Sequence, residues 1–401
     1  MLTAPAVGAP GGLTLGEVVR AALPHFTQSH RLPLHHWKAL RAIAACRTPA
    51  LGGHQYVCTH CGADHFVPHS CGNRHCPTCQ GTQAAQWLEK QVGDLLPIPY
   101  FHLVFTLPHE LNPLIEYNQR ALYALLFKSA TATLLEFGRH QWHASLGITA
   151  VLHTWGQTLI EHYHLHCIVT GGGLALDGSA WVPSRRQWLF AVRARSVVFR
   201  AKFQAGLQRL FDDHQLQFPA AQPRLADPAA FARWMRRAGR HKWVVYSKRP
   251  FAGPQAALAY LCRYTHRVAI TNARFQALDP VDRTVTFSYK DYAHAGTRRA
   301  MTLDLDEFLR RFCRHILPPR FVKIRTFGFL ANRHRAARLA QVRGLLAADQ
   351  PGLATAAAAP QPFQSIEHRP LVCPRCGRPT LILVARIPRP TRPIPALLDS
   401  S

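Results

Sequence analysis

Two histidines and two tyrosines in this chain have the types and the spacing needed for phosphate chemistry. His164 and His166 are separated by one apolar residue, and neutral imidazoles are common ligands of divalent metal ions. Tyr260 and Tyr264 lie four residues apart, so both phenols share one face of a helix. A phenol has a pKa of about 10 and becomes a useful nucleophile only beside a metal ion or cations that stabilise phenolate. Together the four residues predict tyrosines that attack a metal-bound phosphate in turn.

The histidines require a strand that presents them on one face. Their segment reads as a strand in which His162, His164 and His166 share a face while the alternate residues enter the core. We expect His153, at the end of the preceding candidate strand, to be the third ligand, because a hairpin would place it beside the pair. His162 and Glu161 are the alternative third ligands. We expect the ion to be Mg²⁺ or Mn²⁺.

The tyrosines lie in a basic segment. Arg263, His266 and Arg267 are within one helical turn of Tyr264, so they can supply a positive field or bind the flanking phosphates. This favours Tyr264 slightly as the first nucleophile. Taken alone, Tyr260 and Tyr264 would read as core aromatics at helical spacing, and the histidine strand is what favours a catalytic role.

Two pairs of cysteines predict a structural zinc site. Cys58 and Cys61 form one CxxC pair, and Cys76 and Cys79 form a second pair fourteen residues on. Each CxxC turn brings two thiolates to one ion, and tetrahedral zinc takes four such ligands. The surrounding segment 40–82 has little apolar material of its own, so we expect zinc to be required for its folding.

Further candidate ligands lie nearby. A second zinc, or a fused cluster, would use Cys46, His54, Cys71 and His75. Otherwise Cys46 packs as a small apolar residue and the histidines contact DNA. Arg74 makes this zinc-binding module basic, so we expect the module to bind DNA. Near the end of the chain, Cys373 and Cys376 form half of a metal site that needs partners from elsewhere in the sequence.

The charge balance indicates a polyanionic partner. The 401 residues include 48 Lys and Arg against 21 Asp and Glu, which gives a net charge of +27, and nucleic acid is the commonest partner of so basic a protein. No apolar run is long enough to span a membrane, and the first residues lack the pattern of a signal peptide. Eleven cysteines in such a chain favour metal binding or reduced thiols over disulfides. We therefore expect the protein to lie in the reducing cytoplasm.

The hydrophobic pattern predicts an α+β fold. Apolar spacing predicts helices at 14–47, 83–95, 112–139, 194–214 and 304–315, and strands at 100–107, 147–153, 162–169 and 284–292. Three glycines at 171–173 are expected to end the histidine strand. We expect three parts: a helical and zinc-binding DNA-binding domain at 1–92, a catalytic domain with a central antiparallel sheet flanked by helices at 93–335, and a flexible tail with a CxxC island at 336–401.

Several motifs together resemble one family, the rolling-circle insertion-sequence transposases, which are HUH two-tyrosine enzymes with an amino-terminal zinc-binding domain. The motifs span about residues 35 to 335. They are Cys46-Arg47-Thr48, Leu51-Gly52-Gly53-His54, Cys58 to Gly62, Ser70-Cys71, Asn73-Arg74-His75-Cys76-Pro77, Cys79-Gln80, Tyr100-Phe101-His102, Leu107-Pro108-His109-Glu110-Leu111, His153-Thr154-Trp155-Gly156-Gln157, the histidine strand with its glycines, Tyr260 to Ile270, Tyr289-Lys290-Asp291-Tyr292 and Phe327 to Asn332. The chain departs from the family in having His162-Tyr163-His164 where the pattern is His-Pro-His. Because Tyr163 faces away from the histidines, we expect little effect.

The resemblance implies the roles of the site residues. His164 and His166 would be the HUH metal ligands, and an upstream third histidine in related relaxases favours His153. Tyr260 and Tyr264 would be the nucleophiles, with Arg74, Arg263 and Arg267 among the DNA contacts. The expected catalytic domain is then an HUH nuclease domain, and the location that the resemblance implies is the bacterial cytoplasm, in association with the nucleoid.

The implied activity is that of a transposase. It would nick and rejoin a single DNA strand through a covalent 5′-phosphotyrosine intermediate, with single-stranded DNA, element-end hairpins and target DNA as partners. The alternatives are a plasmid replication initiator or relaxase with the same chemistry, and a zinc-dependent DNA-binding regulator without catalysis.

Overall fold

The computed structural model describes most of the chain as two compact units. It covers residues 12–81, 87, 93–184, 189–240, 243–251, 253–254, 256–257, 260, 267–349 and 371–390. One unit, the amino-terminal unit, comprises Met1–Thr82, Ile270–Arg310 and Gln364–Ser401, and the other, the sheet unit, comprises Gln83–Ala269 and Arg311–Phe363. Each unit is thus assembled from segments that are distant in the sequence. The domain limits at 92 and 335 stay predictions.

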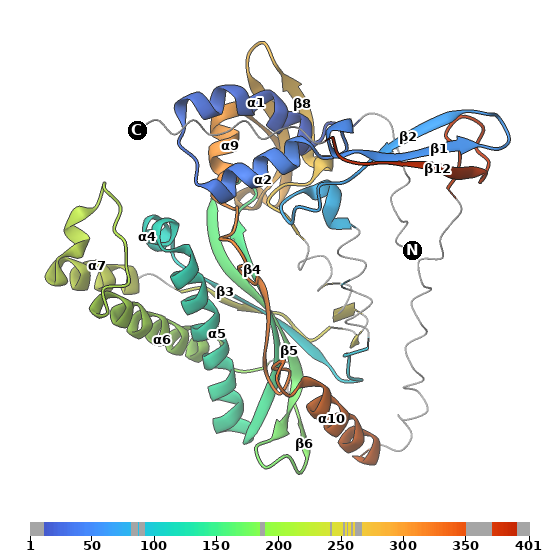
Figure 1. Ribbon diagram of the computed structural model, residues 1–401. Helices are drawn as coiled ribbons and strands as arrows, with labels where there is room; N and C mark the ends of the chain where they lie inside the picture. Colours follow the sequence, from blue (N-terminus) through green and yellow to red (C-terminus); the bar gives the residue numbers. More distant parts are fainter. Residues whose placement is uncertain are drawn as a thin grey trace. The chain divides into compact units, whose positions relative to one another are not determined.

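A six-stranded sheet forms the centre of the sheet unit (Figure 1). The strands run in the order β11-β4-β5-β3-β7, with β6 paired to β5, and all pairs are antiparallel. Their bounds are β3 (Tyr100–Thr106), β4 (Ala144–Trp155), β5 (Glu161–Ala175), β6 (Trp181–Pro183), β7 (Val245–Ser247) and β11 (Ile324–Gly328). The expected strands at 100–107, 147–153 and 162–169 are therefore confirmed, and the last two pair as expected.

Helices pack on both faces of this sheet, most of them on one. The bounds are η2 (His109–Leu111), α4 (Asn112–Tyr117), α5 (Gln119–Trp142), α6 (Val192–Asp212), η3 (Pro223–Ala226), α7 (Pro228–Arg240) and α10 (Arg335–Asp349). Apolar residues of α5, α6 and α7 join Leu165 and Cys167 of β5 in the main core. A smaller core on the opposite side includes Ile168 of β5 and Leu339 of α10.

The two cores follow from the alternation of side chains along the strands. On β5, Leu165 and Cys167 enter the main core, whereas the side chains at 164, 166 and 168 face the other way. The expectation of an α+β fold with a central antiparallel sheet flanked by helices is confirmed.

We expected the glycine run to end the histidine strand, but it does not. β5 continues through Gly171, Gly172 and Gly173 to Ala175. A Cβ at Gly171 would lie 2.7 Å from the carbonyl oxygen of Pro99, and one at Gly173 would lie 2.8 Å from that of Ser145. The β4–β5 register shifts at this point. The glycines therefore allow neighbouring backbones to approach a bulged strand closely.

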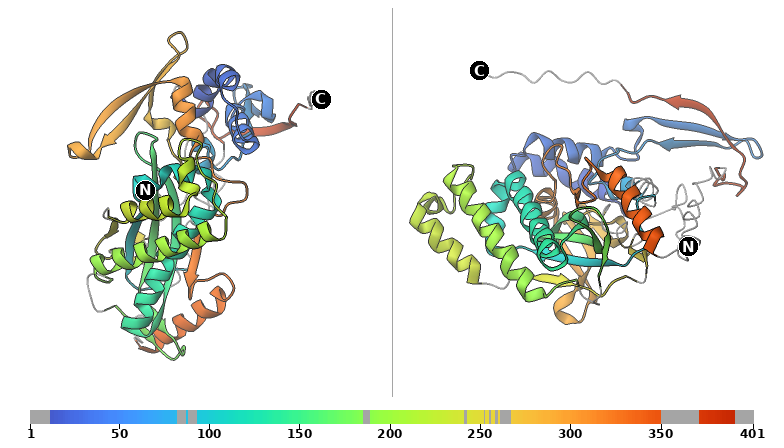
Figure 2. Two further views of the ribbon diagram at one scale, coloured as in Figure 1. Left: turned by 90° about the vertical axis from the view of Figure 1, so that its left-hand side faces the viewer. Right: turned by 90° about the horizontal axis from the view of Figure 1, so that it is seen from below.

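The amino-terminal unit combines helices with two small sheets. Its elements are α1 (Leu15–Ser29), α2 (Leu34–Ala44), η1 (Pro49–Leu51), β1 (Gly53–Cys58), β2 (Asp64–Pro68), η4 (Asn272–Arg274), β8 (Phe275–Asp279), β9 (Thr284–Asp291), η5 (Tyr292–His294), β10 (Thr297–Asp304), α9 (Leu305–Cys313) and β12 (Leu381–Ile387). A capping box between Thr14 and Glu17 fixes the start of α1. The strand orders are β12-β1-β2 and β10-β9-β8, and Figure 2 shows β12 beside the β1–β2 hairpin.

Two elements lie where we expected a flexible tail. α10 occupies Arg335–Asp349 and buries Leu339 and Val342, and β12 pairs with β1 although more than 300 residues separate them in sequence. A strand can pair at any sequence distance, so local composition did not reveal this. The segments 350–370 and 391–401, and most of the expected helix at 83–95, lie outside the described residues. Within the described residues, no helix is long and apolar enough to cross a membrane.

Candidate active site

Three buried histidines converge on the face of the sheet opposite α5. One ring nitrogen of each of His153, His164 and His166 lies within 4.8 Å of the others, a separation that one metal ion can bridge. The β-ladder explains the convergence, because His153 and His164 are directly opposed on β4 and β5, and His166 follows on the same face of β5. The structure thus brings the predicted trio together, and its role as a metal site stays a proposal.

The alternative ligands do not join this cluster. Among the described residues, the candidate metal group contains neither His162 nor Glu161. The Glu161 carboxylate instead forms an ion pair with Arg314. The ring of His162 packs between those of His109 and His164.

Burial keeps two of these imidazoles, those of His164 and His166, neutral. It lowers the pKa of His164 to about 3, and burial next to His153 holds the pKa of His166 far below its usual range. The Nδ1–H of His164 can donate to the carbonyl oxygen of His162 at 2.8 Å, which leaves Nε2 for a metal. Neutral rings can bind a cation without first losing a proton.

A fourth histidine, not predicted as a site residue, links this cluster to a tyrosine. His102 Nε2 lies 2.9 Å from His166 Nδ1, and the Tyr260 hydroxyl lies 3.0 Å from the same Nε2 and 3.1 Å from Nδ1. Burial lowers the pKa of His102 to about 3. On β3 it alternates with the core residues Phe101 and Leu103. That alternation places His102 on the face opposite the main core, but it does not by itself distinguish a site residue from a core residue.

Some of the remaining predicted site residues lie within the described part of the chain, and others lie outside it. Tyr260 packs against Phe251 at a ring distance of 5.1 Å. Tyr264 and Arg263 lie outside the described residues. Arg267 is exposed, and its charge contributes to the lowered pKa values of His164 and His166. Arg74 belongs to the amino-terminal unit and is half-buried.

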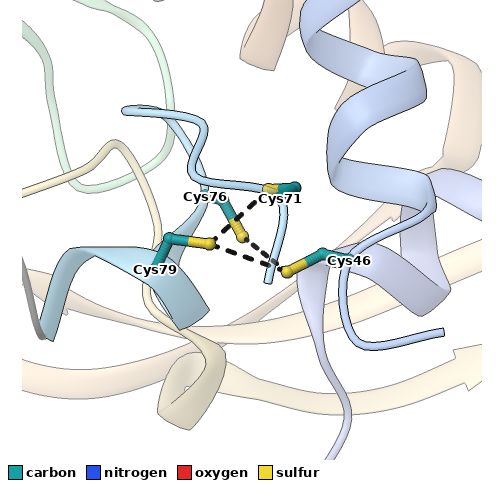
Figure 3. Close-up of side chains that lie close together, drawn as sticks. All are labelled: Cys46, Cys71, Cys76 and Cys79. Atoms are coloured by element: carbon teal, nitrogen blue, oxygen red, sulfur yellow. Dashed lines mark hydrogen bonds between the residues drawn. The ribbon is translucent and has the colours of Figure 1, made fainter. Parts of the chain in front are cut away.

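Four cysteines of the amino-terminal unit form one cluster (Figure 3). The Sγ atoms of Cys46 and Cys79 are 3.7 Å apart, those of Cys71 and Cys79 are 3.5 Å apart, and those of Cys76 and Cys46 are 3.6 Å apart. Four thiolates around a tetrahedral zinc stand about 3.8 Å from one another, since each Zn–S bond is about 2.3 Å long. This group, which we call the first thiol cluster, therefore fits zinc.

The predicted grouping of the cysteines was wrong. Cys58 and Cys61 do not join Cys76 and Cys79, but lie with the carboxy-terminal CxxC pair in a second thiol cluster. The physical reason is that β1 ends at Cys58 beside β12, whereas Cys76 and Cys79 follow β2 and meet the end of α2. The predicted alternative set also divides, because Cys46 and Cys71 join the first thiol cluster and the metal groups of the described chain omit His54 and His75. The ring of His54 packs against His69.

Comparisons with known proteins identify transposases as relatives of this chain. A family described as "Putative transposase" matches residues 147–338, and one described as "Transposase zinc-binding domain" matches residues 18–107. A putative transposase, y4qJ, of Sinorhizobium fredii is 40% identical over 375 residues, which is 92% of each chain. The transposase for insertion sequence element IS801 of Pseudomonas savastanoi pv. phaseolicola is 31% identical over 77% of this chain and 74% of its own length.

Among solved structures, the conjugative relaxase TrwC in complex with oriT DNA, in its metal-bound form, is 14% identical. The comparison covers 64% of this chain and 96% of that chain, with a TM-score of 0.25. The family assignment rests on the sequence relatives, whose similarity spans both the zinc-binding segment and the histidine strand. The chain belongs to the family of rolling-circle insertion-sequence transposases.

Proposed function

We propose that this transposase cuts and rejoins single-stranded DNA by transesterification at the face of the sheet that carries His153, His164 and His166. One observation carries the proposal: a tyrosine hydroxyl is linked through a single imidazole, that of His102, to a cluster of three buried histidines. A nucleophile and a candidate metal site therefore stand side by side in the sheet unit.

The chain's own residues would divide the work as follows. The phenol oxygen of Tyr260 attacks the scissile phosphorus, an O–P bond forms, and the bond from phosphorus to the 3′ oxygen breaks. The DNA 5′ phosphate is then joined to the tyrosine, and the proton lost by the phenol is balanced by the one gained by the 3′ hydroxyl. The bond energy is retained, so rejoining requires no ATP. Tyr264 would make a second such transfer.

His102 acts in this scheme as a positioning residue. Its ring nitrogen accepts a hydrogen bond from the Tyr260 hydroxyl and lies against His166, so it fixes the phenol relative to the metal ligands. Arg267 adds positive charge that favours phenolate and phosphate binding. A Mg²⁺ or Mn²⁺ ion held by His153, His164 and His166 would polarise a non-bridging phosphate oxygen.

The first thiol cluster supplies a second, structural part of the proposal. Its four thiolates fit one zinc ion with no position left open, which is the arrangement of a structural site. It would fold the DNA-binding module around Arg74, whereas the histidine site would serve catalysis. Element-end hairpins and target DNA are the proposed substrates.

Capture of a covalent protein–DNA adduct tests the catalytic proposal. Labelled single-stranded element ends are incubated with Mn²⁺ and the wild type, Tyr260→Phe, Tyr264→Phe or the double variant. We expect adducts with the wild type and none with the double variant. The variant that lacks the first-acting tyrosine should form no adduct. The variant that lacks the second-acting tyrosine should form an adduct but should not complete strand transfer. A double variant that still forms the adduct would sink the assignment, and would favour a regulator without tyrosine chemistry.

The role of His102 needs its own comparison. At saturating Mn²⁺, His102→Phe should slow adduct formation about 10²-fold, whereas His102→Gln, which keeps a hydrogen-bonding group, should retain more of the rate. Equal rates for both variants and the wild type would remove the positioning role. The thermal transition of each variant shows whether only stability has changed.

A further inference from the structure

The carboxy-terminal CxxC pair meets the β1–β2 hairpin in the amino-terminal unit. The Sγ atoms of Cys58 and Cys376 are 3.7 Å apart, and those of Cys61 and Cys373 are 3.8 Å apart. These values match the spacing of about 3.8 Å between thiolates around one tetrahedral zinc, and they are far longer than the S–S bond of a disulfide, about 2.05 Å.

The two CxxC turns have the same backbone conformation. In the first, the N–H of Gly62 donates to the carbonyl of Cys58, and the N–H of Cys58 donates to that of Ala63. In the second, Gly377 donates to Cys373 in the same way, and Cys373 donates to Arg378.

Both turns close on a glycine with positive φ, +68° at Gly62 and +71° at Gly377, in open space. Glycine is therefore favoured at these positions because of the positive φ, and not because a side chain would clash with a neighbour. Two equal turns that present four thiols to one point are what a zinc ribbon needs.

Strand pairing carries the second turn to the first. β12 follows the carboxy-terminal turn and pairs antiparallel with β1 from Cys58↔Leu381 to Gly53↔Ile387. The N–H of Thr59 also donates to the carbonyl of Thr380. A Cβ at Gly52 would lie 2.3 Å from the carbonyl oxygen of Ile387, so the crossing depends on a glycine there. The backbone therefore fixes the position of the thiols independently of any metal.

Polar groups lie beside two of the four sulfur atoms. The Thr380 hydroxyl lies 3.1 Å from Cys58 Sγ, and His65 Nε2 lies 3.3 Å from Cys373 Sγ. A hydroxyl and an imidazole N–H at these distances can donate to thiolate sulfur, as groups around a metal ligand commonly do. Two of the four thiols, those of Cys61 and Cys376, are only partly buried.

We infer that the second thiol cluster, Cys58, Cys61, Cys373 and Cys376, is a structural zinc site that joins the two ends of the chain. The matched zinc-binding domain ends at residue 107, so half of this site lies beyond it. With four thiolates the ion has no open position, and its role is to hold residues 371–390 on the β1–β2 hairpin. The first thiol cluster binds a separate ion, so each chain carries two structural zinc ions.

Metal counting in the full chain tests the inference. Zinc per chain is measured by elemental analysis and native mass spectrometry in a background of His164→Ala and His166→Ala, so that the histidine site cannot contribute. We expect two zinc ions in this background. One should remain in Cys373→Ser/Cys376→Ser, and one in Cys58→Ser/Cys61→Ser. The quadruple serine variant should also keep one, because both pairs hold the same ion.

The matched control changes the same turn without touching a thiol. Arg375 is exposed between the two carboxy-terminal cysteines, and Arg375→Ser should keep two zinc ions. A count of two in Cys373→Ser/Cys376→Ser would overturn the inference, as would loss of two ions in the quadruple variant. These outcomes do not depend on strand transfer, so they are separate from the tests of the histidine site.

A measurement on the wild type guards against variants that fail to fold. Cys61 and Cys376 are partly exposed, so without metal both should react with a maleimide. With zinc bound both should be protected, and a chelator should release them at the same rate. Reaction of Cys376 while Cys61 stays protected would contradict a shared ion. Protection of both that a reductant, and not a chelator, removes would indicate disulfides instead.

Discussion

At the scale of single residues, the histidines on one face of β5 differ in the side chains that their rings contact. His164 and His166 converge with His153, while His162, two residues before, packs its ring towards His109. We predict that His164→Ala or His166→Ala reduces adduct formation by about 10³-fold while single-stranded DNA binding is largely kept, because the proposed DNA contacts are basic residues elsewhere.

His162→Ala is the matched control for this prediction. It removes the same ring from the same strand face and should retain most of the activity. Adduct formation and DNA affinity are measured side by side with Mn²⁺ present. Full activity of either His164→Ala or His166→Ala would remove the metal role, and inactivity of His162→Ala alone would move that role to the alternative ligand.

His315 provides a pH-dependent contribution to stability outside the metal site. Its Nε2–H donates to the carbonyl of Leu159, and the Thr154 hydroxyl donates to Nδ1. Burial lowers the pKa of His315 to about 4, against about 6.5 in the unfolded chain. The unfolded state therefore binds the proton first, so the stability from this residue is present above pH 6.5 and is lost as the pH falls towards 4.

The expected loss is about 2 kcal/mol between pH 7.5 and pH 5. His315→Gln keeps a donor for Leu159 but has no group that titrates in this range. We predict that the free energy of unfolding falls less over this interval in the variant than in the wild type. Chemical denaturation at several pH values measures both slopes. Parallel slopes would show that His315 does not carry the effect.

At the scale of elements, the hydrophobic pattern predicted those strands that depend on local sequence alone. The strand that carries His164 was predicted because histidines alternate with other residues there, and the strand that carries His153 because it is a short apolar run with β-branched residues. The proximity of Cys58 to Cys376 was not predicted, because it depends on the pairing of β12 with β1, which are far apart in the sequence. His102 was missed for a related reason: a single histidine in an apolar strand resembles a core residue until its neighbours are known.

The glycine run illustrates how an element can be misread from local signals. Gly173 lies inside β5, and a Cβ there would meet the backbone of Ser145 at 2.8 Å. We predict that Gly173→Ala destabilises the protein by about 1–3 kcal/mol, because the crowded strands must move apart. Gly344→Ala in α10 is the control, since nothing lies within 4 Å of the added carbon. Thermal denaturation that ranks the two variants equally would contradict the close approach.

At the scale of the whole molecule, we expect the net charge of +27 to govern how the protein finds and holds DNA. Each phosphate neutralised on single-stranded DNA releases counterions, and the logarithm of affinity falls by about 0.7 per phosphate for each decade of salt. For six to ten contacts, we predict that affinity falls by about 10²–10⁴-fold between 50 and 200 mM salt.

Individual arginines should change this slope in a defined way. Arg74→Gln and Arg267→Gln, at two predicted DNA contacts, should each reduce the slope by about 0.7 and weaken binding of all sequences to a similar extent. Lys202→Gln is the control, because the Lys202 ammonium is already paired with Glu136, and it should leave the slope unchanged. Fluorescence anisotropy across a salt series measures all four proteins. An affinity that is flat between low and physiological salt would mean that the excess charge does not contact DNA, and the histidine site would then have to recognise its strand by contacts other than those to phosphate.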